Sequence, residues 1–304
     1  MKISPKRILD FLAVVRHGSF SAAAQATRIS QPGLSQSIAQ LEHALDARIL
    51  DRDRHGARPT ALGNALLYHA ESLESLLERT ALDMDLRIQG LQGHLAIGIT
   101  PIVSTNIVPE ALSTLLDETP DISVSVTDGL DDDILDMLRS LKLDIVVCRL
   151  NSENWGKDLA AEPLFTSDWA VIVRPGHPLA NRESVSLKDL GQEHWVLPAM
   201  GSAFRHQMEL AFKAADVAWP QTNISTNSIL AIKYFIMNTS YVTIMSPQLV
   251  SMECSVGRLH AIPLTDMDPL GPVGMIWRRD QELSPIAARF ARTLRFTAAG
   301  YSQL

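Results

Sequence analysis

Residues 30–42 carry the side chains best suited to forming sequence-specific hydrogen bonds. At about 100° per residue, the apolar positions of this segment fall on one helical stripe that must be buried: Leu34, Ile38, Leu41 and Leu45. The opposite face carries short or amide-bearing residues: Pro32, Gly33, Gln36, Ala39 and Gln40, with Ser35 at its margin. An amide offers a donor and an acceptor together, the combination that reads a base edge. The pattern therefore predicts a helix that lies in the major groove of DNA.

Two short helices joined by a tight turn would position this face. The second begins after Ser30, a preferred N-cap residue, and has Pro32 in its first turn, where a missing N–H costs little. The first, residues 21–28, is rich in alanine, which lets two helices pack closely at a steep angle. Phe20 would fill the small core between them. The order predicts a helix-turn-helix.

These residues resemble the N-terminal signature of the LysR-type transcriptional regulators. That signature pairs Gly-Ser-Phe-x-x-Ala-Ala with Ser-Gln-Pro-x-x-Ser-x-x-Ile-x-x-Leu-Glu, and both halves are present at residues 18–24 and 30–42. The resemblance continues through residues 49–52 to Thr60 and Gly63. Leu50, His55 and Pro59 depart from the residues usual in the family, and His55 and Pro59 could alter the contacts of a wing. The resemblance implies a winged helix-turn-helix.

Carried over residue by residue, the resemblance implies two kinds of contact with double-stranded DNA. The residues expected to face bases are Gln31, Pro32, Ser35, Gln36 and Gln40. The residues expected to hold phosphate or to reach the groove beside the wing are Ser21, Arg52, Arg58 and Thr60. The family likeness also implies a near-palindromic promoter site, RNA polymerase as a further partner, and a homodimer that assembles into a homotetramer.

The charge of the chain is distributed unevenly along its length. Residues 1–60 hold nine Lys and Arg against five Asp and Glu, a local charge of +4, which leaves −11 for the remainder of a 304-residue chain of net charge −7. This asymmetry suits a basic DNA-binding head on an acidic body. Because the excess is modest, phosphate attraction alone should not hold the protein on DNA, and dimerisation should be needed.

A linker helix is expected between Thr60 and about Ile88. Apolar residues recur there at alternating spacings of three and four, the seam of a coiled coil: Leu66, Ala70, Leu73, Leu77 and Met84. The pattern is also compatible with an amphipathic helix packed on its own domain, and the family resemblance favours a helix that pairs two chains. Gly90 and Gly93 mark a hinge. We therefore expect a DNA-binding domain at 1–60 and a dimerisation helix with its hinge at 61–92.

From residue 93 onward short apolar strands alternate with helical patterns, which predicts an α/β region with a largely parallel sheet. The strands are expected at 94–99, 123–127, 144–149, 170–174, 195–197, 242–245 and 273–277. The helices are expected at 106–118, 133–140, 204–215, 229–237 and 285–294. The order is similar to the LysR effector domain, which has the two lobes of a periplasmic solute-binding protein. The resemblance implies an α+β multidomain chain, with lobe one at 93–163 and 268–304 and lobe two at 164–267.

An effector site is expected where strands end beside helix N-termini, since unpaired N–H groups and the helix dipole favour an anion there. Lobe one contributes Thr100, Pro101, Ser104, Thr127 and Asp128. Lobe two contributes Pro198, Ser202, Arg205, Asn227, Ser228 and Pro247. Hydroxyls and one arginine suit a small organic acid. Each hydroxyl could instead cap a helix, Arg205 could form a surface ion pair, and Asp128 could select an amine or hydroxyl.

Catalysis and metal binding find no support in the motifs. There is no His-Glu-x-x-His, Gly-x-Ser-x-Gly, glycine-rich phosphate loop or Cys/His cluster at ligand spacing, so no enzyme, metal or cofactor is expected. Asp131–Asp133 more simply charge a helix N-terminus, and His177 stands in a turn. The sequence predicts a ligand-responsive transcription regulator. A solute-binding receptor or enzyme on the same two-lobed fold is the alternative.

The cysteine content and the hydropathy of the chain concern its compartment. Only Cys148 and Cys254 occur, far apart in sequence, so no disulfide framework is implied, and Cys148 lies in an apolar strand pattern typical of a buried thiol. A redox sensor would need an exposed thiol of low pKa, which is a minor alternative. The first residues do not form a signal peptide, and no apolar stretch is long enough to span a bilayer. A cytoplasmic protein without a membrane partner is expected.

Overall fold

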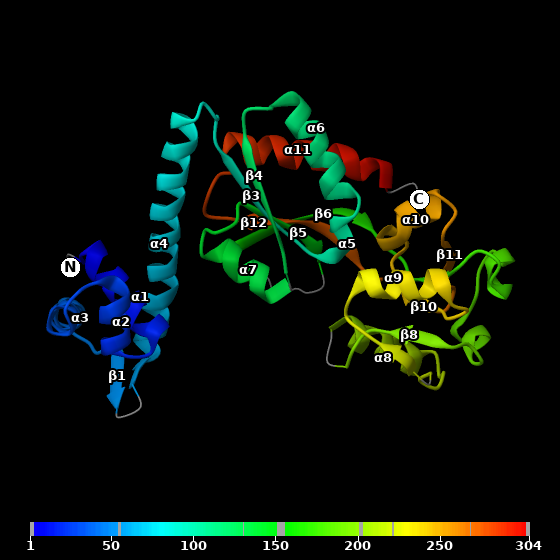
Figure 1. The fold of residues 1–304 in the computed structure, drawn as a ribbon, viewed down its shortest axis with the longest axis horizontal. Helices are drawn as coiled ribbons and strands as arrows, with labels where there is room; N and C mark the ends of the chain where they lie inside the picture. Colours follow the sequence, from blue (N-terminus) through cyan, green and yellow to red (C-terminus); the bar gives the residue numbers. More distant parts are fainter. Residues whose placement is uncertain are drawn as a thin grey trace. The chain divides into compact units, whose positions relative to one another are not determined.

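The computed structural model describes residues 3–53, 56–129, 131–150, 156–200, 203–220, 222–267 and 269–301. The chain divides into two compact units (Figure 1). The first comprises Met1–Ala96 with Asp121–Ser125 and Leu135–Asp144, and the second comprises Ile97–Pro120, Val126–Ile134 and Ile145–Leu304. Among the described residues, no helix is both long and apolar enough to cross a bilayer.

The N-terminal segment is a winged helix-turn-helix, as predicted. Its elements are α1 (Pro5–His17), α2 (Phe20–Thr27), α3 (Gln31–Leu45) and the antiparallel hairpin of β1 (Leu50–Asp53) and β2 (Gly56–Pro59). The Ser30 hydroxyl accepts a hydrogen bond from Gly33 N at 3.3 Å and caps α3. Leu34, Ile38 and Leu41 are completely buried against Phe11 of α1 and its neighbours, which confirms the apolar stripe of α3.

Helix α4 (Ala61–Ile88) follows directly, capped by Thr60. Its first half packs on the helix-turn-helix core, where Ala70 is fully buried and Leu66 is partly buried. Its second half leaves apolar side chains exposed within a single chain, among them Leu77 and Met84 at about half of their full exposure (49% and 48%). The second half also contacts its own chain, since Leu86 is buried and Arg79 pairs with Asp144 and donates to Leu141 O at 3.0 Å. That α4 pairs two chains stays a prediction.

Lobe one is built on a five-stranded sheet of order β4-β3-β5-β12-β6. The strands are β3 (His94–Ile99), β4 (Ser123–Asp128), β5 (Ile145–Arg149), β6 (Leu159–Thr166) and β12 (Pro272–Arg278), and the helices are α5 (Pro101–Ser104), α6 (Ile107–Glu118), α7 (Asp131–Arg139) and α11 (Pro285–Tyr301). β3 and β5 are parallel, but β12 is antiparallel to both β5 and β6. The prediction of a largely parallel sheet is therefore wrong. The chain leaves through β6 and returns through β12, and an outgoing and a returning strand run in opposite directions.

Lobe two contains a small antiparallel sheet of order β10-β7-β11 and a parallel pair, β8 and β9. The strands are β7 (Ala170–Val173), β8 (Trp195–Leu197), β9 (Thr222–Ser225), β10 (Thr243–Met245) and β11 (His260–Pro263); the helices are α8 (Ala203–Ala214), α9 (Ile229–Asn238) and α10 (Ser251–Ser255), with 3-10 turns η1 (Pro178–Asn181), η2 (Leu187–Leu190) and η3 (Pro247–Val250). Alternate residues of β7 enter different apolar clusters: Val171 and Val173 one, Ala170 and Ile172 the other. This period of two buries both faces of the strand.

Two chain crossings connect the lobes, and hydrogen bonds tie the crossings together. Leu270 N on the returning segment donates to Ser167 O on the outgoing segment at 2.9 Å. The guanidinium of Arg149, at the end of β5, donates to Leu270 O at 2.8 Å and to Gly271 O at 3.1 Å. These contacts form a hinge region next to the predicted lobe boundaries at 163/164 and 267/268, which themselves remain predictions.

Candidate nucleic-acid interface and ligand site

Helix α3 presents the polar face that the sequence predicted. Gln31, Pro32, Gln36 and Gln40 are exposed and Ser35 is half-buried. Ser21 of α2 is also exposed, and its hydroxyl donates to Gln31 Oε1 at 3.3 Å, which orients that amide. The polar groups on this face of α3 are therefore accessible to base edges without any rearrangement of the protein core.

The neighbouring residue Ser37 connects α3 to α1 on the side away from the exposed face. Its hydroxyl donates a hydrogen bond to the Asp10 carboxylate on α1. Asp10 is only 5% exposed, so this bond satisfies a charge that is removed from water. One side of α3 is thus anchored by a polar contact and by apolar packing, while the opposite side is left to solvent.

Glu42, near the end of α3, connects this helix to the wing formed by β1 and β2. Its Oε1 accepts a hydrogen bond from Ile49 N at 3.0 Å, and its Oε2 lies 3.4 Å from Arg52 Nη2. The Arg52 guanidinium also lies over the Phe20 ring, 4.6 Å from the centroid. These two contacts hold Arg52 in place while its side chain stays 45% exposed, as a phosphate contact requires.

The other predicted wing residues differ in how much of their polar capacity is used. Arg58 is exposed on β2, opposite Asp51. The Thr60 hydroxyl donates to Arg48 O at 3.0 Å and accepts from Gly63 N at 3.1 Å, so it caps α4 and has little capacity left for phosphate. Of the two departures named for the wing, His55 lies outside the described residues and Pro59 ends β2.

The wing is also held to the turn between α1 and α2. Ala57 N donates to Gly18 O at 2.8 Å. Gly56 has a φ of +132°, and a Cβ there would lie 2.3 Å from Gly18 O. Only glycine permits this approach, so the sequence fixes where the wing meets the first helix pair.

Three of the predicted ligand residues of lobe one lie at α5, and the other two lie at the end of β4. Thr100 follows the β3 strand and is 8% exposed. Its Oγ1 has no hydrogen-bond partner among the described residues, although Thr100 occupies the N-cap position of α5. Pro101 opens the helix, and Ser104 donates to Pro101 O at 2.8 Å. Thr127 is half-buried and Asp128 exposed at the end of β4. Thr100 is therefore a buried hydroxyl that lacks the cap bond its position offers.

The predicted residues of lobe two are mostly engaged with their own lobe. Arg205 Nε donates to Glu209 Oε1 at 2.7 Å, its Nη1 donates to Pro198 O at 3.2 Å, and its guanidinium lies 5.0 Å from the Trp219 ring centroid. The ion-pair alternative for Arg205 is thus what the structure contains.

The remaining lobe-two residues hold local backbone. Ser228 caps α9 by accepting from Ala231 N at 3.3 Å. Asn227 Oδ1 accepts from Ala199 N at 3.0 Å. Pro198 follows β8 and is buried. Pro247 opens η3, and Ser202 lies outside the described residues.

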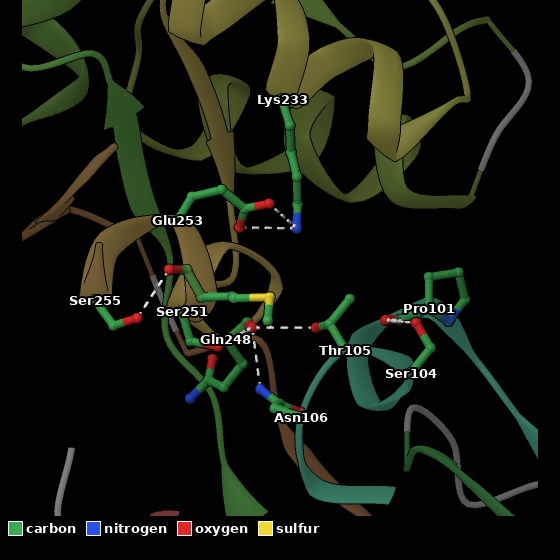
Figure 2. A network of polar contacts seen from close by, with 10 residues as sticks. Pro101, Ser104, Thr105, Asn106, Lys233, Gln248, Ser251, Glu253 and Ser255 are labelled. Atoms are coloured by element: carbon green, nitrogen blue, oxygen red, sulfur yellow. Dashed lines mark hydrogen bonds and ion pairs between the residues drawn. The ribbon is translucent and has the colours of Figure 1, made fainter. Parts of the chain in front are cut away.

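Helix α5 of lobe one and η3 of lobe two meet at Gln248, as Figure 2 shows. Asn106 Nδ2 donates to Gln248 O at 3.0 Å, and Thr105 Oγ1 lies 3.5 Å from the same oxygen. This meeting brings Pro101 and Ser104 to the same junction as Pro247. The sequence reasoning missed Asn106 and Gln248, because the pairing of two residues 142 positions apart leaves no local pattern.

An ion pair between a buried lysine and a half-buried glutamate lies near the same junction and was also missed. Lys233 Nζ on α9 contacts both carboxylate oxygens of Glu253 on α10, at 2.9 and 3.0 Å (Figure 2). The Lys233 side chain is 7% exposed. Its signal in the sequence was a charged residue inside the apolar pattern of α9, since a lysine is rarely buried unless paired.

The cysteines, His177 and the acidic run occupy structural positions. Cys148 is fully buried in β5. Burial raises the pKa of the half-buried Cys254 thiol above its ordinary value. His177 is buried and its Nδ1 accepts from Leu179 N at 3.2 Å, while α7 begins at Asp131. Among the described residues, no group of His, Cys, Asp and Glu has the arrangement of a metal site.

Two family models match the chain. Residues 6–64 match the model described as "Bacterial regulatory helix-turn-helix protein, lysR family", and residues 89–299 match the "LysR substrate binding domain". The first covers the helix-turn-helix and the start of α4, and the second covers both lobes. Together they span the two parts whose geometry is described above.

Curated relatives and solved structures cover nearly the same length. The chain is 28% identical over 284 residues to the regulator PcaQ of Agrobacterium fabrum, covering 93% of this chain and 91% of the relative. It is 24% identical over 286 residues to GbpR of Azospirillum brasilense, covering 94% and 84%. The crystal structure of full-length CbnR with its target DNA has a TM-score of 0.65 at 21% identity, covering 97% of this chain and 100% of that one. The last shows a shared fold.

Proposed function

Because this chain belongs to the LysR family of bacterial helix-turn-helix transcription regulators, we propose that it reads a near-palindromic promoter site and that a small organic acid sets its activity. The family assignment makes it a DNA-binding regulator with an effector-binding domain and not an enzyme. We propose the individual residues that contact DNA, the near-palindromic form of the DNA site and the chemical class of the effector.

The observation that carries the DNA part is the exposed amide face of α3. Gln36 and Gln40 lie one turn apart on a helix whose opposite face is fully buried. An amide can bond adenine through two hydrogen bonds in the major groove. Gln31, Pro32 and Ser35 would complete the base-facing surface, with Ser21, Arg52 and Arg58 toward the DNA backbone. Thr60 would support the wing as the cap of α4, since its hydroxyl is already bonded to Arg48 O and Gly63 N.

A single helix of this length reads a few base pairs, so we infer that two copies act together. In a dimer, two α3 helices would enter successive major grooves about one helical turn apart, which makes the site a near-palindrome. The second half of α4 exposes the apolar residues that could pair two chains: Leu76, Leu77, Leu82, Met84 and Ile88. Assembly into a tetramer and contact with RNA polymerase complete the proposal by family resemblance.

The DNA part is tested by titrating a duplex with purified protein over a range of salt concentrations. The proposal predicts that log K falls linearly with log salt, with a slope of about −0.9 per phosphate contact. The rival function, a solute-binding receptor or enzyme on the same lobes, predicts no salt-dependent affinity for DNA. Absence of such affinity in folded, oligomeric protein would contradict the proposal.

The observation that carries the ligand part is the Thr100 hydroxyl, which has no hydrogen-bond partner in the part of the chain that the structure describes. A buried hydroxyl without a partner costs free energy, and a bound carboxylate or other oxygen ligand would remove that cost. Thr100 stands at the N-cap position of α5, so a small organic acid placed against that end of α5 would reach its hydroxyl.

The ligand part is tested by thermal unfolding of the protein with a panel of aliphatic and aromatic carboxylic acids. A ligand of the folded state raises stability by RT ln(1 + [L]/Kd), so an acid that binds raises Tm with its concentration. The matched control is Thr100→Val, which keeps the shape and loses the hydroxyl. The proposal predicts that this variant needs more acid for the same shift. Equal shifts in both proteins would contradict the role of Thr100, and stabilisation by amines alone would favour Asp128 as the selecting group.

A further inference from the structure

Gln248 is a residue whose backbone and side chain bond to different parts of the fold. Its carbonyl oxygen accepts from Asn106 Nδ2 of lobe one at 3.0 Å. Its side-chain Oε1 accepts from Ser167 Oγ at 2.9 Å and contacts Ser246 Oγ. Ser167 lies on the outgoing crossing between the lobes, and Ser246 ends the β10 strand of lobe two.

The side of Gln248 that faces lobe two is rigid. Ser167 and Ser246 are each 1% exposed, and their hydroxyl oxygens lie 2.7 Å apart. Ser167 also accepts from Leu270 N of the returning crossing at 2.9 Å. Because Ser167 and Ser246 are buried and both bond to the half-buried Gln248, moving Gln248 relative to the hinge would break more than one hydrogen bond at once. Gln248 is therefore a fixed point of the hinge.

The side of Gln248 that faces lobe one depends on one amide. Asn106 uses both ends of its side chain: Oδ1 accepts from Ile107 N at 2.6 Å at the start of α6, and Nδ2 donates across to Gln248 O. Thr105 Oγ1, at 3.5 Å, adds a weaker contact to the same carbonyl (Figure 2). The donor from Asn106 is thus the strong bond between α5–α6 and η3 at this point.

We propose that Asn106 and Gln248 form a latch that sets the angle between the two lobes. The latch joins the segment that follows Thr100, Pro101 and Ser104 to the hinge network, so it positions one wall of the proposed effector site against the other lobe.

The energetics set how far the latch can bias the lobes. One neutral hydrogen bond exchanged for bonds to water shifts an equilibrium by roughly 2- to 10-fold. Replacing the Nδ2 donor by a second oxygen does more, because a carboxylate oxygen would then face the Gln248 carbonyl at hydrogen-bond distance. The lobes need only a shift of this size to populate a second arrangement measurably.

The variant Asn106→Asp tests the latch with little other change. The carboxylate keeps an acceptor for Ile107 N and suits a helix N-terminus, so the cap of α6 is preserved. Only the donor to Gln248 is lost. The matched control is Asn238→Asp, which makes the same charge change and also removes an Nδ2 donor to a carbonyl, that of Tyr234 at 2.7 Å, within lobe two.

The lobe angle is measured by electron–electron double resonance between nitroxides at two exposed positions, Ser113 on α6 and Lys213 on α8. Both are changed to Cys in a Cys254→Ser background, with Cys148 left in the core. Labelled chain is diluted with unlabelled chain so that only distances within one chain contribute. The latch predicts a broader or shifted distance distribution in Asn106→Asp and an unchanged one in Asn238→Asp. Identical distributions in Asn106→Asp and the parent would overturn it.

Gln248→Met gives a second, independent test if Asn106→Asp fails to fold. Methionine keeps the length of the side chain and the backbone carbonyl but removes the acceptor for Ser167 and Ser246. The latch predicts that this variant also broadens the distribution, and that the two changes together add little beyond either one. A narrow, parental distribution in Gln248→Met would overturn it. The measurement uses no ligand, so its outcome is separate from whether a small organic acid is the effector.

Discussion

Replacing Gln36 by alanine should weaken binding to the cognate site and leave binding to unrelated DNA unchanged. Gln36 is exposed on α3, while Leu34 and Ile38 on either side of it are fully buried. Its amide can therefore serve DNA without serving the fold. The change separates reading of bases from attraction to phosphate, because it removes no charge.

The expected magnitude follows from the chemistry of one amide on one base. A bidentate pair with adenine contributes about 1–3 kcal/mol of discrimination. Since each 1.36 kcal/mol is about tenfold, the loss is about 5- to 150-fold in Kd for each recognition helix engaged. Alanine is the better helix former by a few tenths of a kcal/mol, so Tm should not fall.

The assay is fluorescence anisotropy with a cognate duplex and a scrambled one at the same salt concentration. Ser37→Ala is the control, since Ser37 points inward and its loss leaves the buried Asp10 carboxylate without that donor. We expect Ser37→Ala to lower the free energy of unfolding by about 1–3 kcal/mol and to keep the ratio of the two affinities. Equal losses on both duplexes for Gln36→Ala would refute its base-reading role.

Three further predictions concern single residues. Arg52→Ala should weaken binding to cognate and scrambled duplexes alike. In a salt titration, the slope of log K against log salt should become less steep by about one; an unchanged slope would place Arg52 away from phosphate. Burial lowers the pKa of His94 below its ordinary value of 6.5; the Asp144 charge opposes this shift and the Arg79 charge adds to it. As the pH falls, His94 is therefore protonated in the unfolded chain before it is protonated in the folded protein. The free energy of unfolding should therefore decrease as the pH falls below 6.5, and urea titrations should show a smaller decrease in His94→Gln; an equal decrease would exclude His94 as its source. Burial raises the pKa of the Cys254 thiol, so a thiol reagent should react with Cys254 slowly. Cys148 is buried and should react only after the protein unfolds. Fast reaction of either thiol with loss of DNA binding would favour the redox alternative.

The elements predicted best from the sequence are those with a regular pattern of burial along the chain. The stripe of α3 has a strict helical period because one face packs on a core and the other does not, so the start of the helix and its exposed residues could both be inferred. The strands β3, β5 and β8 are short apolar runs that the structure buries throughout or nearly so. Their positions were predicted within a residue.

The strands missed by the sequence reasoning lie at sheet edges. β6 contains Glu162 and Pro163 and is the last strand of its sheet, where a missing N–H is tolerated. β11 ends in Pro263 at the edge of the sheet in lobe two. Because an edge strand needs burial and pairing on one side only, its sequence carries a weaker apolar pattern.

The ligand residues show a different limit. Thr100 and Ser228 both end or follow strands and look alike in sequence, but Ser228 caps its helix and Thr100 does not. Arg205 could be assigned to a ligand from the sequence because nothing there says that its side chain pairs with Glu209 one turn later. Which polar groups are already bonded is a property of tertiary packing, and the latch residues Asn106 and Gln248 depend on it entirely.

The most direct test of the central claim is selection of bound fragments from the genomic DNA of the source organism by purified protein at physiological salt. The Gln36→Ala, Arg52→Ala double variant serves as the control. A DNA-reading regulator should enrich a few near-palindromic promoter sites, and the variant should lose them, with the adjacent genes then suggesting the effector. No enrichment by folded, oligomeric protein, repeated with cell metabolites added, would contradict the account and favour a solute-binding or enzymatic role for the two lobes.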